Sequence, residues 1–213
     1  MLVALLSTTL WVVLQQTGTP AQSRAVPVVI VLETEAGAIT VEIDTVHAPI
    51  TAANFLKYVD GGFYDGGEFH RTVRPDTEVR KDVPIQVVQA RINQARVSES
   101  YPPIPLERTS VTGLKHLNGS LTMARDVTPT SPGPDTATSG FAICMGDQPI
   151  MDFPSKRSPD GQGYAVFGRV IAGMEVVKKI HAAHAPKDTP ATNLAGAGQT
   201  LVPTIKIIRA YRK

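Results

Sequence analysis

Short segments of alternating apolar and polar residues run through the chain and predict β-strands. Residues 39–43 alternate strictly, and the β-branched run 28–32 precedes them. Glu35-Ala36-Gly37 lies between these two segments and is typical of a turn, so together they predict a β-hairpin. Further segments with strand-like patterns are 69–73, 85–89, 120–124, 141–145, 165–171 and 204–210.

Two segments have helical spacing instead. The first begins at Pro49, ends at Asp60-Gly61-Gly62, and carries one apolar face made of Ala52, Phe55, Leu56 and Val59. The second follows Gly173, and the residues that share its face are Met174, Val177, Ile180 and His181. Many short strands with a helix near each end predict a mainly β fold, a closed antiparallel barrel capped by two α-helices.

Four segments between these elements are predicted to be loops. They are residues 74–84, 90–117, 128–138 and 185–200. Loops of this length often carry function or are mobile. Residues 185–200 are rich in Ala, Gly and Pro, and we expect them to form a flexible excursion.

Composition narrows the class of protein without naming a function. The chain has 213 residues, of which 42% are apolar and 19% charged, a balance typical of one globular domain. The net charge is +2 and no cluster of Lys and Arg occurs, so a nucleic-acid partner is not expected. Cys144 is the only cysteine, which excludes a disulfide within the chain, and its apolar neighbours predict a buried thiol.

Residues 1–25 differ from the rest and predict a secretory signal peptide. Residues 1–14 are almost wholly apolar, too few to span a bilayer, and small residues follow at two possible cleavage sites, Thr19-Pro20-Ala21 and Ser23-Arg24-Ala25. No positive charge precedes the apolar run, which leaves an uncleaved anchor as the alternative. We expect a periplasmic or secreted protein with its folded domain at 26–213 and no other membrane contact.

Three short islands carry the strongest functional signal. Phe69-His70-Arg71, followed by Gln89, forms the first; residues 119–125 form the second; residues 139–168, with the run 161–168, form the third. In composition and order they resemble the active-site lining of cyclophilins, the peptidyl-prolyl cis–trans isomerases. The resemblance extends from about Val28 to Arg209 and implies an eight-stranded barrel with two helices, in agreement with the pattern above.

The resemblance also implies a chemistry. An X–Pro amide isomerises slowly because rotation breaks its resonance, with a barrier of about 18–20 kcal/mol. Catalysis needs a pocket for the proline ring and a donor aimed at the prolyl nitrogen, with no metal or cofactor. By resemblance, Arg71 is this donor, and Gln89 hydrogen-bonds the substrate backbone and orients Arg71. The alternative for Arg71 is an exposed strand arginine that pairs with an acid such as Glu68 or Asp76. The alternative for Gln89 is an ordinary polar residue at the end of a strand.

By resemblance, the proline pocket is lined by Val87, Ala124, Ala142, Met151 and Tyr164, and the adjoining peptide groove by Arg125 and Gly140. Ala142 stands where the family often has Phe, and Tyr164 where His is common. Because an aromatic ring buries roughly 150–250 Å², this change predicts a shallow pocket and a high apparent KM. We also expect weak inhibition by cyclosporin.

We therefore expect a monomeric isomerase that acts on proline-containing polypeptides outside the cytoplasm and assists their folding. Two alternatives stay open. One is a non-catalytic module of the same fold that holds proline-containing segments as a chaperone. The other is a barrel that binds small molecules, which only the fold favours. His70 is expected to be a structural hydrogen-bonding residue behind Arg71 rather than an acid or base.

Overall fold

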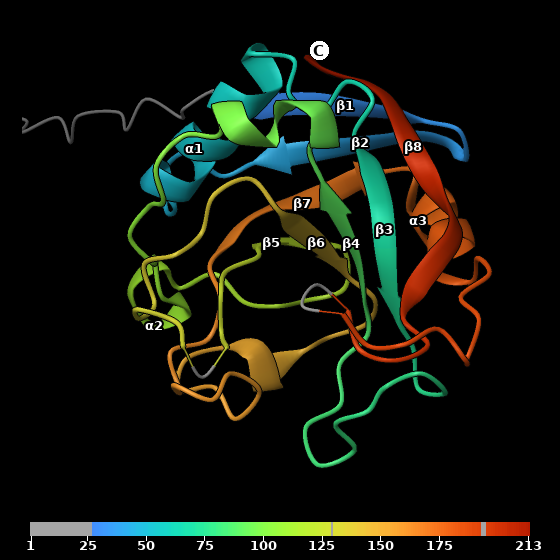
Figure 1. The fold of residues 1–213 in the computed structure, drawn as a ribbon. Coiled ribbons are helices and arrows are strands. Elements are labelled where there is room, and N and C mark those ends of the chain that lie inside the picture. Colours follow the sequence, from blue (N-terminus) through green and yellow to red (C-terminus); the bar gives the residue numbers. More distant parts are fainter. Residues whose placement is uncertain (1–26, 129, 193–194) are drawn as a thin grey trace, which may run out of the picture.

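Eight antiparallel strands close into a barrel in the computed structural model, which describes residues 27–128, 130–192 and 195–213 (Figure 1). The strands are β1 Val28–Thr34, β2 Gly37–Ile43, β3 Glu68–Val73, β4 Val87–Arg91, β5 Ser120–Met123, β6 Phe141–Cys144, β7 Val166–Ala172 and β8 Thr200–Arg212. Their order around the barrel is β1-β2-β7-β5-β6-β4-β3-β8, and pairing of β1 with β8 closes the ring. The predicted mainly β barrel is confirmed, including the hairpin of β1 and β2.

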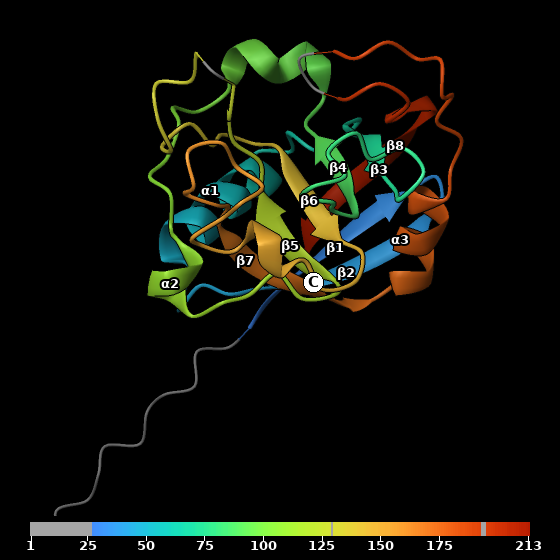
Figure 2. The same ribbon diagram turned by 90° about the horizontal axis from the view of Figure 1, so that it is seen from below.

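Two helices lie on opposite sides of the barrel, α1 Pro49–Asp60 and α3 Met174–His181 (Figure 2). The first turn of α1 has no side-chain cap of its own. Instead, the Glu107 carboxylate accepts the backbone N–H groups of Ile50 at 3.0 Å and Thr51 at 2.7 Å, which satisfies two N–H groups that a helix start leaves unpaired. The predicted loop 90–117 contains two short helical segments, η1 Gln94–Glu99 and α2 Thr109–Thr112, and a further turn, η2 Pro149–Met151, follows β6.

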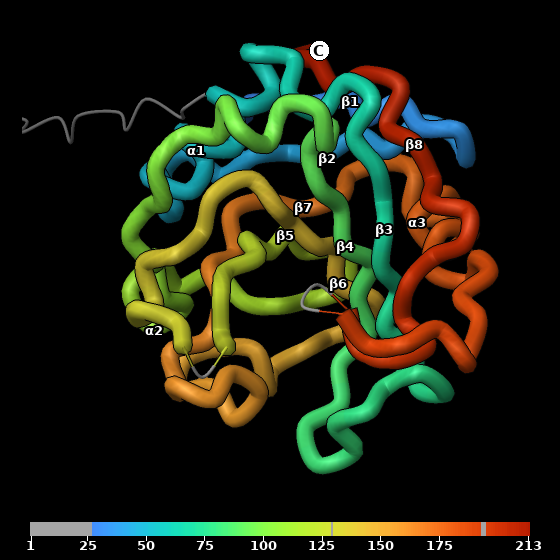
Figure 3. The backbone as a smooth tube through the Cα atoms, in the orientation of Figure 1, coloured from blue at the N-terminus to red at the C-terminus, as the bar shows by residue number. Residues whose placement is uncertain are grey.

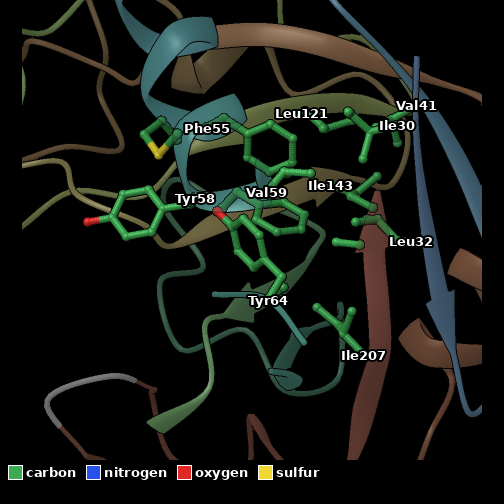
Figure 4. Close-up of a cluster of buried hydrophobic side chains, with 14 of the residues drawn as sticks. Ile30, Leu32, Val41, Phe55, Tyr58, Val59, Tyr64, Leu121, Ile143 and Ile207 are labelled. Carbon is green, nitrogen blue, oxygen red and sulfur yellow. The ribbon is translucent and has the colours of Figure 1, made fainter. Parts of the chain in front are cut away.

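The main core fills the barrel and extends beneath both helices. Phe55 of α1 points toward side chains of the surrounding strands (Figure 4), whereas the Tyr58 ring packs against the rings of Phe63 and Tyr101. The Phe55 ring lies 5.4 Å from Phe141 and 5.1 Å from Phe167, measured between ring centroids. These aromatic contacts join α1 to β6 and β7. The apolar face predicted for this helix is therefore the face that packs against the barrel.

A second, smaller apolar cluster lies on the outer face of β3, β4 and β6. Along β6, Phe141 and Ile143 enter the barrel core while Ala142 and Cys144 enter the second cluster. Burial on both faces explains why this strand is a continuous apolar run rather than an alternating one. Burial also raises the pKa of the Cys144 thiol to about 12, so the thiol stays protonated and is the buried apolar residue that its neighbours predict.

The strand bounds differ from the predicted ones by one to four residues, most of all at the start of β8, which runs beside β3 in Figure 3. Strand β4 begins at Val87 rather than at residue 85, and β8 begins at Thr200 rather than at residue 204. The additional residues of β8 start opposite β3, where Thr200 is the partner of Arg71. The predicted flexible excursion therefore ends in ordered structure, because its last residues pair with a strand distant in sequence.

The predicted signal peptide, residues 1–25, lies outside the described residues. Within the part of the chain that the structure describes, no helix combines the length and apolar character needed to cross a membrane.

Candidate active site

A groove of about 630 Å³ lies across four neighbouring strands of the barrel, β5, β6, β4 and β3. All nine residues that the sequence predicted for the site line it: Arg71, Val87, Gln89, Ala124, Arg125, Gly140, Ala142, Met151 and Tyr164. Alternation along β4 explains part of this gathering, since Val88 faces the barrel core while its neighbours Val87 and Gln89 face the groove. The structure brings the residues together; their individual roles stay predictions.

A bulge in β3 brings two consecutive residues to this groove. Phe69 pairs with Ala90 and Arg71 with Gln89, which leaves His70 without a partner on β4. The pairing of β3 with β8 shifts at the same place. Consecutive residues of a regular strand point to opposite faces, but a bulge redirects them. His70 and Arg71 therefore both line the groove, while the Phe69 ring stays in the barrel core.

Two side-chain amides hold the Arg71 guanidinium. Nη1 donates to Gln89 Oε1 at 2.9 Å. Nε and Nη2 both donate to Gln199 Oε1, at 2.9 and 2.7 Å. A guanidinium has five N–H groups, so these three bonds leave one N–H on each terminal nitrogen. The half-buried guanidinium is thus fixed on two sides and can still donate.

Within the described part of the chain, no carboxylate forms an ion pair with Arg71. The sequence alternative, pairing with Glu68 or Asp76, is wrong, because Glu68 binds Arg91 and Lys206, and Asp76 binds Arg74. Burial, followed by the positive charge of Arg157, lowers the pKa of Arg71 from 12.5 to about 10. The guanidinium therefore keeps its charge at neutral pH.

Gln89 is placed to do two things at once. Its Oε1 atom accepts from Arg71, as described above, and it stands directly opposite Arg71 in the β3–β4 ladder. Among the described residues none accepts a hydrogen bond from its Nε2 group. This N–H group can therefore donate to a peptide carbonyl in the groove while the oxygen keeps its hold on the guanidinium.

One end of the groove is apolar and belongs to the second cluster described above. The residues common to both are Ile85, Val87, Ala142 and Met151, with Tyr164 packed against them. Met151 is 3% exposed and Ala142 6% exposed, so the small Ala142 side chain forms a floor rather than a wall. The arrangement offers an apolar recess on the same groove that Arg71 lines.

Arg125 is held differently from Arg71. Its guanidinium is fully buried and makes a bidentate ion pair with Asp160, with N–O distances of 2.8 and 2.7 Å. Nε donates to the carbonyl of Gly163 at 2.7 Å, and the Arg125 Cζ atom lies 5.3 Å from the centroid of the Tyr164 ring. Hydrogen bonds from Arg125 outweigh burial and lower the pKa of Asp160 to about 2. The side chain thus fixes the loop that carries Tyr164.

His70 does not have the role expected for it. The residue is 5% exposed, and neither ring nitrogen has a hydrogen-bond partner among the described residues. Burial, together with the positive charges of Arg91 and Arg71, lowers its pKa to about 3. The ring is therefore neutral at physiological pH. The expected hydrogen-bonding role is not seen within the described structure.

Sequence reasoning missed several residues of this site, above all Gln199. It lies at the end of the segment predicted to be a flexible excursion, and no local pattern distinguishes it from other polar loop residues. Its contact with Arg71 spans 128 positions in sequence. Arg91, another groove residue, was not predicted for the site; it pairs with the buried Glu68 at 2.6 Å.

Comparison with known proteins decides the family. Residues 29–210 match the family described as "Cyclophilin type peptidyl-prolyl cis-trans isomerase/CLD". The chain is 33% identical over 161 residues to peptidyl-prolyl cis–trans isomerase A of Dickeya dadantii, covering 76% of this chain and 75% of that protein. The chain belongs to the cyclophilin-type peptidyl-prolyl cis–trans isomerase family. A second isomerase, from Acinetobacter baylyi, is 35% identical over 158 residues, covering 74% of this chain and 73% of that one.

Solved structures agree with this family at the level of the fold. A crystal structure of a cyclophilin-type isomerase from Cryptosporidium parvum matches with a TM-score of 0.64 at 18% identity, covering 88% of this chain and 98% of that one. A structure of the same protein in the presence of the dipeptide Ala-Pro matches with a TM-score of 0.63 at 19% identity, covering 87% and 98% of the two chains. Family and relatives together make this cyclophilin an enzyme, a peptidyl-prolyl cis–trans isomerase.

The side chains of the structure can also be examined for a possible metal site. Among the described residues, no group of three or more His, Cys, Asp and Glu side chains is placed to hold a metal ion. Amide, hydroxyl and guanidinium groups line the groove together with His70 and Asp126, and the amides and hydroxyls suit a peptide ligand.

Proposed function

We propose that Arg71 stabilises the twisted prolyl amide while the apolar recess beside it holds the proline ring. The observation that carries this proposal is the Arg71 guanidinium itself. Two neutral amides fix it, and among the described residues no carboxylate forms an ion pair with it and one N–H group on each terminal nitrogen stays free. It lines the same groove as the apolar recess of Val87, Ala142 and Met151.

The proposed step is a rotation that needs no covalent intermediate. As the X–Pro bond twists, the prolyl nitrogen becomes pyramidal and its lone pair can accept a hydrogen bond from Arg71. A charge-assisted hydrogen bond contributes about 1.5–3 kcal/mol, and about 1.4 kcal/mol changes a rate tenfold. This one bond would therefore supply roughly one to two powers of ten. Positioning of the peptide supplies the remainder.

The rest of the groove would hold the peptide on either side of proline. In this proposal Tyr164 and Met151 contact the ring, and Gln89 donates its free N–H to a backbone carbonyl. Gly140 and Ala124 leave room for the chain beside β5 and β6. Arg125 acts through the loop that it fixes. The solved neighbour with Ala-Pro carries the same fold, which is why a dipeptide of this kind is the first ligand to test.

The test is exchange NMR on an Ala-Pro peptide. We expect the wild-type protein to accelerate cis–trans exchange and Arg71→Ala to lose at least about tenfold of this rate while still binding the peptide. Arg169→Ala is the matched control, since Arg169 is an exposed arginine on β7 that pairs with Glu42 away from the groove. Full exchange activity in Arg71→Ala would contradict the proposal.

We also propose that the enzyme acts on exported polypeptides, as a monomer. The apolar run at residues 1–14, followed by small residues, supports export. All nine residues proposed for the groove gather within a single chain, so the proposed site needs no second copy to complete it. Fusion of residues 1–26 to an alkaline phosphatase reporter, active only after export, tests the location. Mass spectrometry of the exported chain distinguishes cleavage from anchoring, and light scattering measures the oligomeric state.

The control for this fusion carries Leu5→Arg and Leu6→Arg, which interrupt the apolar run. We expect export of the fusion and retention of the control. Equal, low reporter activity in both would contradict the proposed location and leave the isomerase assignment intact, because the two rest on different parts of the chain.

A further inference from the structure

Gln199 is the least expected residue beside Arg71. It immediately precedes β8, it is fully buried, and its Oε1 atom accepts from both Nε and Nη2 of Arg71, at 2.9 and 2.7 Å. One acceptor that receives two N–H groups of the same edge of a guanidinium restricts rotation of the whole planar group. Gln89 holds the opposite side through Nη1.

Gln199 is itself held on every side. Its Nε2 group donates to the carbonyl of Thr77 at 3.0 Å, and its Oε1 atom also accepts from the backbone N–H of Gly196 at 3.0 Å. Its backbone carbonyl accepts from the N–H of Thr72 at 2.9 Å. A Cβ atom at Gly196 would lie only 3.0 Å from the Gln199 amide, so the chain there must approach closely. The amide is therefore pre-oriented, with little freedom to lose when substrate binds.

The partner chosen for this task has a chemical consequence. A carboxylate in this place would hold the guanidinium equally well but would neutralise it. A neutral amide orients the group and leaves its full charge available to a new acceptor. Because Gln199 is completely buried, water does not compete for these bonds. Gln199 thus fixes the orientation of the Arg71 guanidinium without neutralising its charge.

From these contacts we infer that Gln199 is a positioning residue for the isomerisation, acting through Arg71 by fixing the plane of its guanidinium toward the prolyl nitrogen. This inference rests on the proposed role of Arg71. Two segments hold the Gln199 amide in place. The segment that precedes β8 does so through the N–H of Gly196, and the loop 74–84 does so through the carbonyl of Thr77. The sequence predicted both segments as loops but assigned neither of them a contact with Arg71.

The first experiment compares Gln199→Leu with wild type in the Ala-Pro exchange assay. We expect kcat to fall about 10-fold to 100-fold, the range typical of a misplaced reacting group, with KM changed less than about 2-fold because the apolar recess is untouched. Thr34→Val is the control for loss of a buried side-chain hydrogen bond outside the groove, since the Thr34 hydroxyl donates to the carbonyl of Gly37 in the β1–β2 turn. It should leave both constants unchanged.

The second experiment distinguishes positioning from a general structural effect. In an Arg71→Ala background, Gln199→Leu should lower kcat no further, because its route of action is already gone. A further loss of the same size, or a wild-type kcat in the single Gln199→Leu variant, would overturn the inference. If Arg71→Ala alone were fully active, the proposed function would fail first, so the two failures are distinguishable.

A third measurement covers the case in which Gln199→Leu does not fold. In the wild-type protein, the Nε–H signal of Arg71 should exchange slowly with water, as expected for a hydrogen bond to a buried acceptor. Gln199→Glu keeps the acceptor but adds a negative charge, so it should preserve slow exchange while lowering kcat. Fast Nε–H exchange in the wild-type protein would contradict the inference directly.

Discussion

Arg71 and Arg125 line the same groove, yet their guanidinium groups have opposite kinds of partner. Arg125 is fully buried and binds the Asp160 carboxylate through two parallel bonds. Arg71 is half-buried, and its partners among the described residues are the amide oxygens of Gln89 and Gln199. A carboxylate satisfies the charge of an arginine as well as its geometry, whereas an amide satisfies geometry alone. The two arginines differ in burial and in partner, and the amide partners are what leave the charge of Arg71 available to a bound substrate.

Arg91 extends the comparison to a third arginine of the groove. It donates to the buried Glu68 carboxylate through Nε and Nη2, at 3.0 and 2.6 Å. Lys206 and Thr204 bind the other oxygen of that carboxylate at 2.5 and 2.8 Å. Arg91 therefore resembles Arg125 in kind, and we expect it to stabilise the fold at this edge of the groove.

The largest expected effect is the loss of isomerase activity when the Arg71 guanidinium is removed, which tests the contrast between Arg71 and Arg125. Arg71→Met keeps the apolar stem but removes the guanidinium, so kcat/KM should fall about 10-fold to 100-fold. Its stability should change little, because only neutral amides lose a partner. Isomerase assays and thermal unfolding of the same preparation measure the two effects. A stable Arg71→Met variant with unchanged kcat/KM would contradict the claim that Arg71 acts on the substrate while Arg125 only fixes structure.

The reciprocal change is Arg125→Met, where stability should fall instead. Removing a buried guanidinium from a carboxylate and a carbonyl costs roughly 2–3 kcal/mol of unfolding free energy. Below the unfolding transition, kcat should stay within about threefold of wild type, since Arg125 does not reach the reacting amide in our proposal. Urea titration measures the stability difference. A loss of kcat as large as that of Arg71→Met would show that the loop of Tyr164 takes part more directly.

A smaller effect is expected from Ala142→Phe, which enlarges the apolar contact beside Arg71. At about 25 cal/mol per Å², partial contact of an aromatic ring with proline gains on the order of 1 kcal/mol, or about a fivefold rise in kcat/KM. The gain should appear mainly in KM, because the contact does not depend on the twist of the amide. An unchanged or lower kcat/KM in a folded variant would contradict the assignment of Ala142 to the proline recess.

The smallest of the expected effects is the loss of folding stability when the pH is lowered. It tests whether carboxylates stabilise the fold while the amides that hold Arg71 do not respond to pH. Burial raises the pKa of Glu68, but hydrogen bonds from Lys206, Arg91 and Thr204 outweigh it and lower the pKa from 4.5 to about 2. The pKa of Asp160 is lowered from 3.8 to about 2. Because the folded pKa values lie below the unfolded ones, both groups stabilise the fold fully above pH 4.5 and lose this contribution progressively toward pH 2.

Urea midpoints measured between pH 7 and pH 3 check this prediction. They should be flat to about pH 4.5 and then fall, and Glu68→Gln should reduce the fall. The kcat of the protein that remains folded should not follow this titration, because the amides that hold Arg71 do not ionise. A kcat that titrated with the carboxylates would indicate that Arg71 depends on a charged partner after all.

Local pattern predicted the barrel well because strand and helix periodicity are properties of neighbouring residues. The hairpin of β1 and β2 and the bounds of α1 follow from local pattern, and on α3 the spacing identified Val177 and Ile180 but missed the buried Val176. Phe69-His70-Arg71 and Gln89 were predicted as site residues by resemblance, and their strands pair directly in the barrel. Bounds were less accurate at β8, where Pro203 interrupts the apparent strand, since proline lacks the N–H that a strand interior uses.

By itself, the sequence determined which segments become strands and helices, and which side chains lie on one face of each, because these depend on periodicities of two and 3.6 residues. Only the tertiary structure decided how the arginines are held. Arg71 meets Gln199 across 128 positions, and Arg125 meets Asp160 across 35. Such partners become neighbours only when β3 pairs with β8 and the loops fold over the barrel. Closure of the chain in space, which no local pattern records, therefore determines whether a guanidinium meets a carboxylate or an amide.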